Sequence, residues 1–185
     1  MRWGTIIIMM KRIVIVGSGG SGKSTLAKQI GSLRSLDVTH LDSLFWKPGW
    51  IRASAQEQQS ILDEIINRAS WIIEGDHMRT QSFRFAVADT IIFLDFPRSV
   101  CLWRTTKPFI QNRGTSRLGM AAGCPERLHW TLLNWVWRYP QDNRPKVIEN
   151  IERCAKGRRI IILRRPQDTR QFVADLVNTD PGRMP

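Results

Sequence analysis

The residues from Gly17 to Thr25 have the types and the spacing needed to hold a chain of phosphates. They read Gly-Ser-Gly-Gly-Ser-Gly-Lys-Ser-Thr, which fits the pattern G-x-x-x-x-G-K-[ST] without a departure. The glycines allow a tight turn that points successive backbone N–H groups at phosphate oxygens. Lys23 can place its charge between the phosphates, and the Ser24 hydroxyl can hold Mg²⁺. We therefore predict an ATP site formed by Gly17, Ser18, Gly19, Gly20, Ser21, Gly22, Lys23, Ser24 and Thr25.

Four acidic residues lie where predicted strands end, and these positions suit the chemistry of phosphoryl transfer. They are Asp42, Glu74, Asp76 and Asp95. One carboxylate beside the loop can hold Mg²⁺ through water, and a second can orient or deprotonate a substrate hydroxyl. Acidic residues at strand ends also cap the following helix or turn, and we favour that role for Asp95. For Asp42 and Glu74 we favour the functional role.

Strands and helices are predicted to alternate along the chain, and they determine where these residues lie. Apolar runs predict strands at 12–16, 38–41, 71–73, 90–94 and 158–163. Helical spacing of apolar residues and cap signals predict the main helices at 23–35, 55–69, 98–112, 145–155 and 166–177. This order predicts an α/β protein with the three-layer P-loop NTPase fold, in which helices flank a five-stranded parallel sheet. Because the carboxyl ends of parallel strands meet at one edge, the residues above should share one cleft.

The length and the cysteines of the chain limit what can be built around this loop. With 185 residues we expect one domain over residues 1–185, so any substrate site must come from the loops of the same fold. Residues 1–10 are expected to be an N-terminal extension, and its run Ile6–Met10 is too short for a membrane span. The three cysteines are odd in number and lack C-x-x-C spacing, which indicates reduced thiols and a cytoplasmic location. A monomer and a homodimer both stay open.

The net charge of +12 is concentrated in the second half of the chain. Eleven basic and nine acidic residues precede residue 98, whereas residues 98–170 contain 16 basic and five acidic residues. Such a basic region can close over a triphosphate, bind nucleic acid or form a solvated surface. A nucleotide needs only a few of these charges. We therefore expect most of them to be surface charges, and nucleic acid stays an open but not favoured partner.

Motifs beyond the P-loop carry a resemblance to adenylate-kinase-type P-loop kinases, which have the nucleoside monophosphate kinase fold. The motifs are Gly17–Thr25, His40–Asp42, Trp71–Gly75 with Arg79, Ile92–Pro97, and Arg104. Three other segments resemble more closely the bacterial FlaR-like, or DNA topology modulation, proteins. They are Leu41–Trp50, Gly123–Arg127 and Trp135–Trp137. The resemblance covers the chain from about Met10 to Val177.

The kinase resemblance implies roles for residues on the acceptor side of the site. It implies that Glu74 lies near Mg²⁺ and that Asp42 lies near the phosphoryl acceptor. It also implies that Gly75 and Arg79 bind the acceptor, the arginine through a phosphate.

The same resemblance implies how the nucleotide is covered. Arg104 matches an arginine that packs on the base and phosphates of ATP. Residues 113–127 match an arginine-rich lid, in which Arg113 and Arg117 would stabilise the migrating phosphoryl group.

Two departures from the kinase pattern bear on the acceptor. The signature Asp-Gly-Phe-Pro-Arg is one residue longer here, Glu74 to Arg79, and the arginine expected three residues after Asp42 is Phe45. AMP is therefore not established as the acceptor. Trp46 and Trp50 suit a stacking platform for a base and core packing equally well.

Two further groups have a structural interpretation that we favour. His77 follows the third predicted strand and could relay a proton, but a lone histidine is more often a hydrogen-bonding residue. Trp130, Trp135 and Trp137 have helical spacing and are expected to pack against the core or other helices.

Together these features predict a Mg²⁺- and ATP-dependent kinase whose acceptor is unknown. Its predicted catalytic residues are Lys23, Asp42, Arg113 and Arg117. The alternative is an ATP-dependent DNA-binding protein that modulates DNA topology. The sequence contains no helix-turn-helix or zinc finger pattern for such a role, and basic charge alone gives only non-specific binding that weakens with salt.

Overall fold

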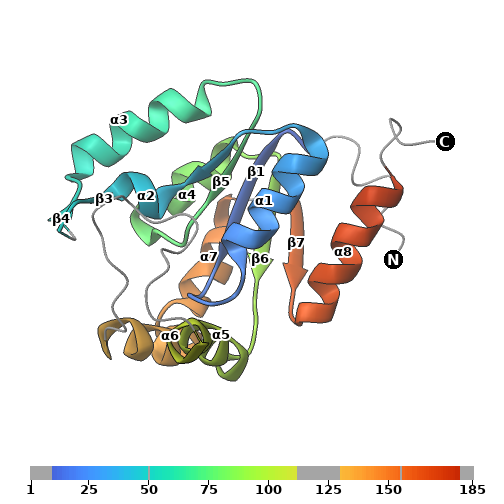
Figure 1. Cartoon of the computed structure of the whole chain (residues 1–185). Coiled ribbons are helices and arrows are strands. Elements are labelled where there is room, and N and C mark those ends of the chain that lie inside the picture. The colour runs from blue at the N-terminus through green and yellow to red at the C-terminus, as the bar shows by residue number, and fades with distance from the viewer. Residues whose placement is uncertain (1–9, 50, 112–129, 155, 180–185) are drawn as a thin grey trace.

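The structure is a computed structural model that describes residues 10–49, 51–111, 130–154 and 156–179 (Figure 1). Its strands are β1 (Arg12–Gly17), β2 (Val38–His40), β3 (Trp46–Lys47), β4 (Ile51–Arg52), β5 (Trp71–Glu74), β6 (Thr90–Leu94) and β7 (Arg159–Leu163). Its helices are α1 (Lys23–Arg34), α2 (Leu41–Phe45), α3 (Ala55–Ile66), α4 (Met78–Val87), α5 (Arg98–Gln111), α6 (Trp130–Asp142), α7 (Arg144–Cys154) and α8 (Pro166–Asn178). None of these described helices is both long and apolar enough to cross a membrane.

Five of the strands form one parallel sheet in the order β2-β5-β1-β6-β7. β1 lies in the centre and pairs with β5 and β6, with Ile15 opposite Glu74 and Gly17 opposite Leu94. The carboxyl ends of the strands therefore meet at the edge where β1 leads into the loop before α1. This arrangement confirms the predicted α/β fold with a helix-flanked parallel sheet.

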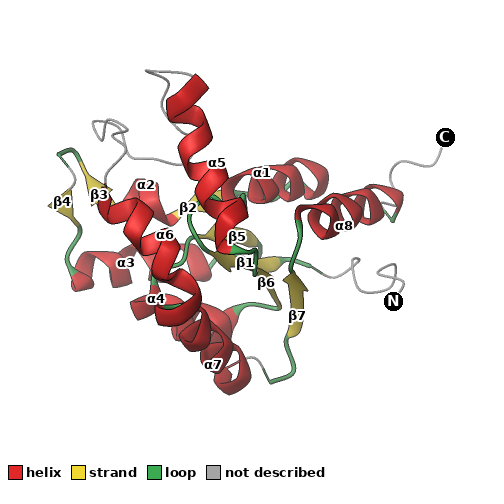
Figure 2. Ribbon diagram, turned by 90° about the horizontal axis from the view of Figure 1, so that it is seen from below, coloured by secondary structure: helices red, strands yellow, loops and turns green. Residues whose placement is uncertain are grey.

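Alternate residues of β1 face opposite sides of the sheet and enter two separate cores. Ile13 and Ile15 pack in one core with apolar residues of α1 and α8. Val14 and Val16 pack in the other core with residues of α3, α4 and α7. Figure 2 shows α1 and α8 on one side of the sheet and α4 and α7 on the other. Because both faces are covered, the central strand is apolar along most of its length.

The segment after β2 forms regular structure that is not among the predicted strands and main helices. Leu41 to Phe45 form α2, and the strands β3 and β4 pair antiparallel as a small hairpin. Leu41 and Phe45 are four residues apart, so one turn of helix brings both side chains into the second core. α3 then begins at the predicted capping box, where Ser54 and Glu57 each accept a hydrogen bond from the backbone N–H of the other.

Met10 and Trp130 depart from their predicted environments. Met10 belongs to the first core rather than to an extension, and residues 1–9 lie outside the described part of the chain. Trp130 is 80% exposed instead of packed, Trp137 is 52% exposed with Arg98 of α5 over its ring, and Trp135 contacts both cores. The reason is helical geometry: residues seven apart share one side of α6, and a residue five positions away lies on another.

Candidate functional site

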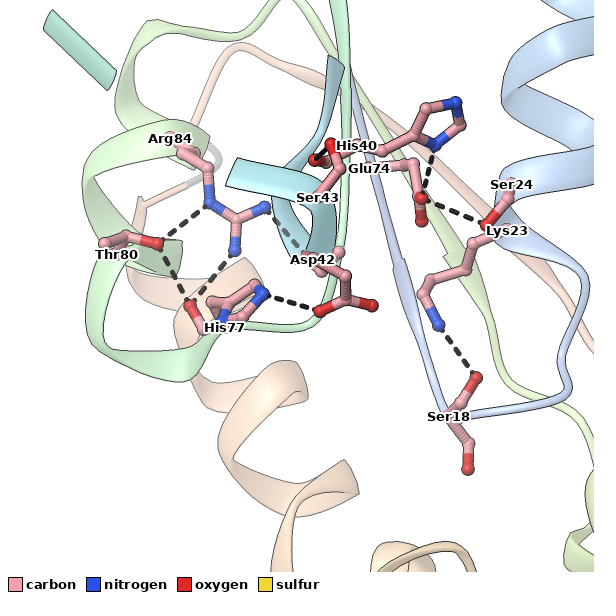
Figure 3. Close-up of polar contacts among 11 residues, drawn as sticks. Ser18, Lys23, Ser24, His40, Asp42, Ser43, Glu74, His77, Thr80 and Arg84 are labelled. Carbon is pink, nitrogen blue, oxygen red and sulfur yellow. Dashed lines mark hydrogen bonds and ion pairs between the residues drawn. The ribbon is translucent and has the colours of Figure 1, made fainter. Parts of the chain in front are cut away.

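The predicted P-loop joins β1 to α1 and contains three glycines with a left-handed backbone. Gly17, Gly20 and Gly22 have φ angles of 145°, 74° and 96°. Residues with side chains rarely adopt such angles. Lys23 folds back over the loop, and its Nζ donates a hydrogen bond of 2.9 Å to the backbone carbonyl of Ser18 (Figure 3). The ammonium group is therefore held against the loop in which phosphates are expected.

Neighbouring elements press closely on this loop. A Cβ added at Gly17 would lie 2.6 Å from the carbonyl oxygen of Leu94 at the end of β6. One added at Gly20 would collide with the carbonyl oxygen of Cys101 in α5, and one added at Gly19 would lie 3.0 Å from a side chain of α6. The loop thus needs glycines for space as well as for conformation.

Glu74, the last residue of β5, reaches the start of α1. The Ser24 hydroxyl donates a 3.0 Å hydrogen bond to Glu74 Oε1, and His40 Nδ1 lies 2.7 Å from the same oxygen. The other oxygen, Oε2, is buried and has no hydrogen-bond partner among the described residues. A buried carboxylate oxygen without a partner, next to a P-loop serine, fits a Mg²⁺ ion that takes its other ligands from phosphates and water.

His40 is held beside this carboxylate at the end of β2. The hydrogen bond to Glu74 raises the pKa of the imidazole, with further help from the charges of Glu74 and Asp42, while burial acts in the opposite direction. The described residues contain no group of three or more acidic, histidine or cysteine side chains able to hold a metal. Any Mg²⁺ here would therefore depend on the nucleotide phosphates for most of its ligands.

Asp42 lies in α2 and faces a histidine from the loop after β5. His77 Nε2 is 2.9 Å from Asp42 Oδ1, and the pair is visible in Figure 3. Desolvation would raise the pKa of Asp42, but the hydrogen bond and the charge of His77, together with Lys23 and His40, lower it overall. Asp42 is therefore ionised at neutral pH, and its side chain is partly exposed.

Asp76 is a second aspartate near the P-loop, but in a different environment. It is buried and accepts a 3.0 Å hydrogen bond from the Tyr139 hydroxyl of α6. Burial raises the pKa of Asp76 to about 6, against the opposing effects of Lys23, Tyr139 and Arg84. Its second oxygen is buried without a partner among the described residues.

Arg84 is a fully buried cation that fixes the loop between β5 and α4. Its guanidinium donates to the carbonyl oxygens of Gly75 at 2.9 Å and His77 at 3.1 Å, and to the Thr80 hydroxyl at 3.3 Å. Burial lowers the pKa of Arg84 to about 10, so it stays protonated at neutral pH. The Arg84 side chain therefore fixes the backbone on both sides of Asp76.

The other sequence-predicted residues occupy several positions around the cleft. Arg104 of α5 donates a 3.3 Å hydrogen bond to the carbonyl oxygen of Ser21, which places it at the P-loop. Gly75 has a φ of 138° and passes close to Leu41, whereas Arg79 is exposed on α4. The lid arginines Arg113 and Arg117, with the rest of 113–127, lie outside the described residues.

Asp95 has a partner that the sequence did not indicate. It accepts two hydrogen bonds, of 2.7 and 2.9 Å, from the guanidinium of Arg144. This ion pair ties the start of α7 to the end of β6. The interaction that the structure shows for the Asp95 side chain is thus an ion pair between elements, whereas the sequence favoured a capping role.

Three residues of the site were given no role by sequence reasoning. His40 stands at the end of a predicted strand, so its position was a usable signal. Arg84 and Tyr139 lie in the middle of helices and meet the site only through tertiary packing. Neither has a local pattern that marks it.

Solved structures of kinases share this fold. A shikimate kinase from Acinetobacter baumannii in complex with shikimate is 13% identical and matches 95% of each chain, with a TM-score of 0.60. A gluconokinase from Sinorhizobium meliloti 1021 is 15% identical and matches 91% of this chain and 90% of its own, with a TM-score of 0.53. A shikimate kinase from Bacteroides thetaiotaomicron is 16% identical over 91% of this chain and 97% of its own, with a TM-score of 0.52.

Comparisons of the amino-acid sequence do not assign the chain to a family. No protein-family model and no curated protein sequence matches the chain. The resemblance to DNA topology modulation proteins, and the DNA-binding alternative that came with it, receive no support from these comparisons. The fold that the chain shares with these structures is that of P-loop kinases.

Proposed function

We propose that the protein is a phosphotransferase that moves the γ-phosphoryl group of ATP to a hydroxyl group of a small acceptor. The observation that carries this proposal is the hydrogen bond between Ser24 of the P-loop and Glu74, whose second oxygen has no partner among the described residues. Kinases of similar fold that act on hydroxylated molecules support the choice of reaction.

The reaction needs little covalent chemistry from the protein. The acceptor oxygen forms a bond to the γ-phosphorus, and the bond from that phosphorus to the bridging oxygen breaks, so ADP leaves with the electron pair. The hydroxyl proton passes to the Asp42 carboxylate. Lys23 and the P-loop N–H groups hold the phosphates and stabilise the charge that develops on them.

Ser24 and Glu74 are the residues that would hold Mg²⁺ in this reaction. When bound, the ion neutralises charge on the phosphates. Arg104, which bonds to the P-loop carbonyl of Ser21, would contact the nucleotide, and Gly75 and Arg79 would line the acceptor side, as the resemblance to kinases implies. Arg113 and Arg117 would supply positive charge over the phosphates, as the resemblance to kinases implies.

The key experiment measures ADP formation from Mg-ATP by the purified protein. The acceptor panel contains nucleoside monophosphates, nucleosides and small hydroxylated metabolites. One acceptor should stimulate ADP formation, and Lys23→Ala should reduce that stimulated rate by about 100-fold or more, because it removes the charge at the phosphates. Circular dichroism should show the variant folded.

A matched control separates the loss of this charge from a general effect of losing a cation. Arg68→Ala removes a cation from the exposed surface beyond α3, where Arg68 pairs with Glu64 at 3.4 Å. It should leave the stimulated rate unchanged. Full turnover in Lys23→Ala, or a wild-type protein that binds ATP and responds to no acceptor, would overturn the proposal.

A further inference from the structure

We propose that His77 is a positioning residue that holds the Asp42 carboxylate in place for the acceptor hydroxyl. This inference rests on the proposed function and deepens it. It assigns the two oxygens of one carboxylate to different tasks, one fixed by the protein and the other left for the substrate.

In the pair of His77 and Asp42, the histidine is the buried partner and the aspartate is the exposed one. The His77 side chain is 9% exposed, whereas the Asp42 side chain is 44% exposed. His77 Nε2 lies 2.9 Å from Asp42 Oδ1. Figure 3 shows the other carboxylate oxygen directed away from His77, toward the side on which Lys23 lies. The open oxygen thus faces the P-loop, where a γ-phosphoryl group would be held.

The histidine itself is fixed by contacts on its backbone and its ring. Its carbonyl oxygen accepts hydrogen bonds from the backbone and hydroxyl of Thr80 and from the guanidinium of Arg84. The ring of Phe45 packs edge-on against the imidazole, with the ring centroids 4.8 Å apart and a 72° angle between planes. A donor held this firmly restricts the carboxylate to one orientation.

Phe45 also links this pair to the identity of the acceptor. It is the residue that stands where the kinase resemblance expects an arginine, and it is fully buried. Arg84 is likewise unavailable to a substrate, because its guanidinium is buried and bonded to backbone carbonyls. Asp42 therefore meets the acceptor as an anion that accepts a hydrogen bond, which suits a hydroxyl group.

His77 would contribute to the reaction only through this orientation. During transfer, the acceptor hydroxyl donates to the open oxygen of Asp42 and gives up its proton to it as the new bond to phosphorus forms. The Nε2–H group of His77 stays on Oδ1 throughout. No proton needs to move through the imidazole.

The test is a double-mutant cycle on the wild-type activity with its best acceptor. His77→Leu should lower kcat by about 10- to 100-fold, the effect of losing a hydrogen bond to a charged group. The KM for ATP should stay within about twofold, because the nucleotide side is untouched. In an Asp42→Asn background the same substitution should change kcat by less than about twofold, since the carboxylate through which it acts is gone.

A conservative variant and a measurement without turnover complete the test. His77→Gln keeps an N–H donor near the position of Nε2 and should restore most of kcat. The pKa of Asp42, followed by carbon NMR, should rise in His77→Leu, because the hydrogen bond and the charge of His77 lower it in the native protein. The NMR measurement does not depend on the acceptor or on residual activity in Asp42→Asn.

The outcomes distinguish this inference from the proposed function. A wild-type protein that transfers phosphate to no acceptor overturns the proposed function and, with it, the role of His77. An active wild type in which His77→Leu costs the same in both backgrounds shows a merely structural role and overturns the inference alone. An unchanged Asp42 pKa in His77→Leu also overturns it.

Discussion

Asp42 and Asp76 lie near the same lysine, and their environments act on them in opposite directions. Hydrogen bonding and charge from His77 outweigh desolvation and lower the pKa of Asp42. Burial dominates at Asp76 and raises its pKa to about 6, even though Tyr139 donates a hydrogen bond to it. The first aspartate is therefore a permanent anion at neutral pH, whereas the second changes its charge within the physiological range.

This difference predicts a pH-dependent stability that belongs to Asp76. Because its pKa is higher in the folded state than the usual value of 3.8, its contribution is fully present below that value. It is lost as the pH rises through about 6. Asp76→Asn keeps an acceptor for Tyr139 but no longer titrates. The free energy of unfolding of this variant, measured with urea, should therefore rise relative to that of the wild type between pH 4 and 7, by up to roughly 3 kcal/mol.

A carboxylate with the opposite shift provides the control. The hydrogen bond from Lys47, with those of Ser54, lowers the pKa of Glu57 to about 2. Its contribution is present above the usual value of 4.5 and is lost as the pH falls through about 2, so Glu57→Gln should fall behind the wild type as the pH rises from about 2 to 4.5 and stay parallel to it above that. Curves for Asp76→Asn and wild type that stay parallel between about pH 4 and 7 would contradict the role of burial at Asp76.

At the scale of elements, the P-loop is shaped by the helices packed around it. α5 approaches Gly20 so closely that there is no room for a Cβ, and Arg104 of the same helix bonds to the loop carbonyl of Ser21. α6 touches Gly19 and also carries Tyr139 to Asp76. The loop geometry therefore depends on tertiary packing as well as on its own glycines.

Two glycines with the same backbone angle allow this dependence to be measured. Gly20 and Gly157 both have a φ of 74°, but a Cβ at Gly157 would have no neighbour within 4 Å. Alanine at either site should cost about 1 to 2 kcal/mol of conformational strain. Only Gly20→Ala should also weaken ATP binding, by about tenfold or more, because the clash with α5 displaces the loop that would hold the phosphates. Isothermal titration calorimetry with Mg-ATP would show this, and equal ATP affinity in both variants would contradict it.

At the scale of the whole molecule, the excess of basic residues bears on binding to DNA. The charge of +12 lies mostly between residues 98 and 170, where only part of the chain is described. Arg98 packs over the ring of Trp137 at 4.1 Å, and Arg144 is paired with Asp95. Some of this charge thus serves contacts within the fold.

We expect DNA binding to be non-specific. The affinity should fall steeply and linearly on a log–log plot against salt concentration, and it should be the same with and without Mg-ATP. Fluorescence anisotropy with a labelled duplex would measure both properties. An affinity that survives physiological salt and changes with ATP would favour the DNA-binding alternative over the kinase.

The sequence predicts the sheet and the P-loop well because both depend on local patterns. The run Ile13–Val16 and the motif that follows it fix a strand, a turn and a helix within a few turns of chain. The predicted strands at 71–73 and 90–94 are recovered as β5 and β6 for the same reason. The parallel sheet then brings Ser24 and Glu74 together, as the strand order requires.

Contacts that depend on long-range packing could not be predicted from the sequence. Arg84 lies within an ordinary helical pattern. Its role depends on hydrogen bonds to the carbonyl oxygens of Gly75 and His77, which only the folded loop brings within reach. Phe45 was noted as a departure, but its contact with His77 depends on α2, a helix too short to show a periodic pattern. Trp130 shows what helical spacing cannot predict. The spacing tells which residues share one side of a helix, but not whether another element packs against that side.

The central position of β1 has a consequence for folding of the chain during its synthesis. Arg12 pairs with Trp71 and Ile13 pairs with Thr90, so the first strand has no partner until much of the chain has been made. During synthesis, α1 can cover the face of β1 that carries Ile13 and Ile15, but the face that carries Val14 and Val16 packs against α3, α4 and α7, which are made later. Such non-local pairing slows folding and exposes the nascent chain to aggregation. The strand order that centres the P-loop thus also delays the pairing of the first strand.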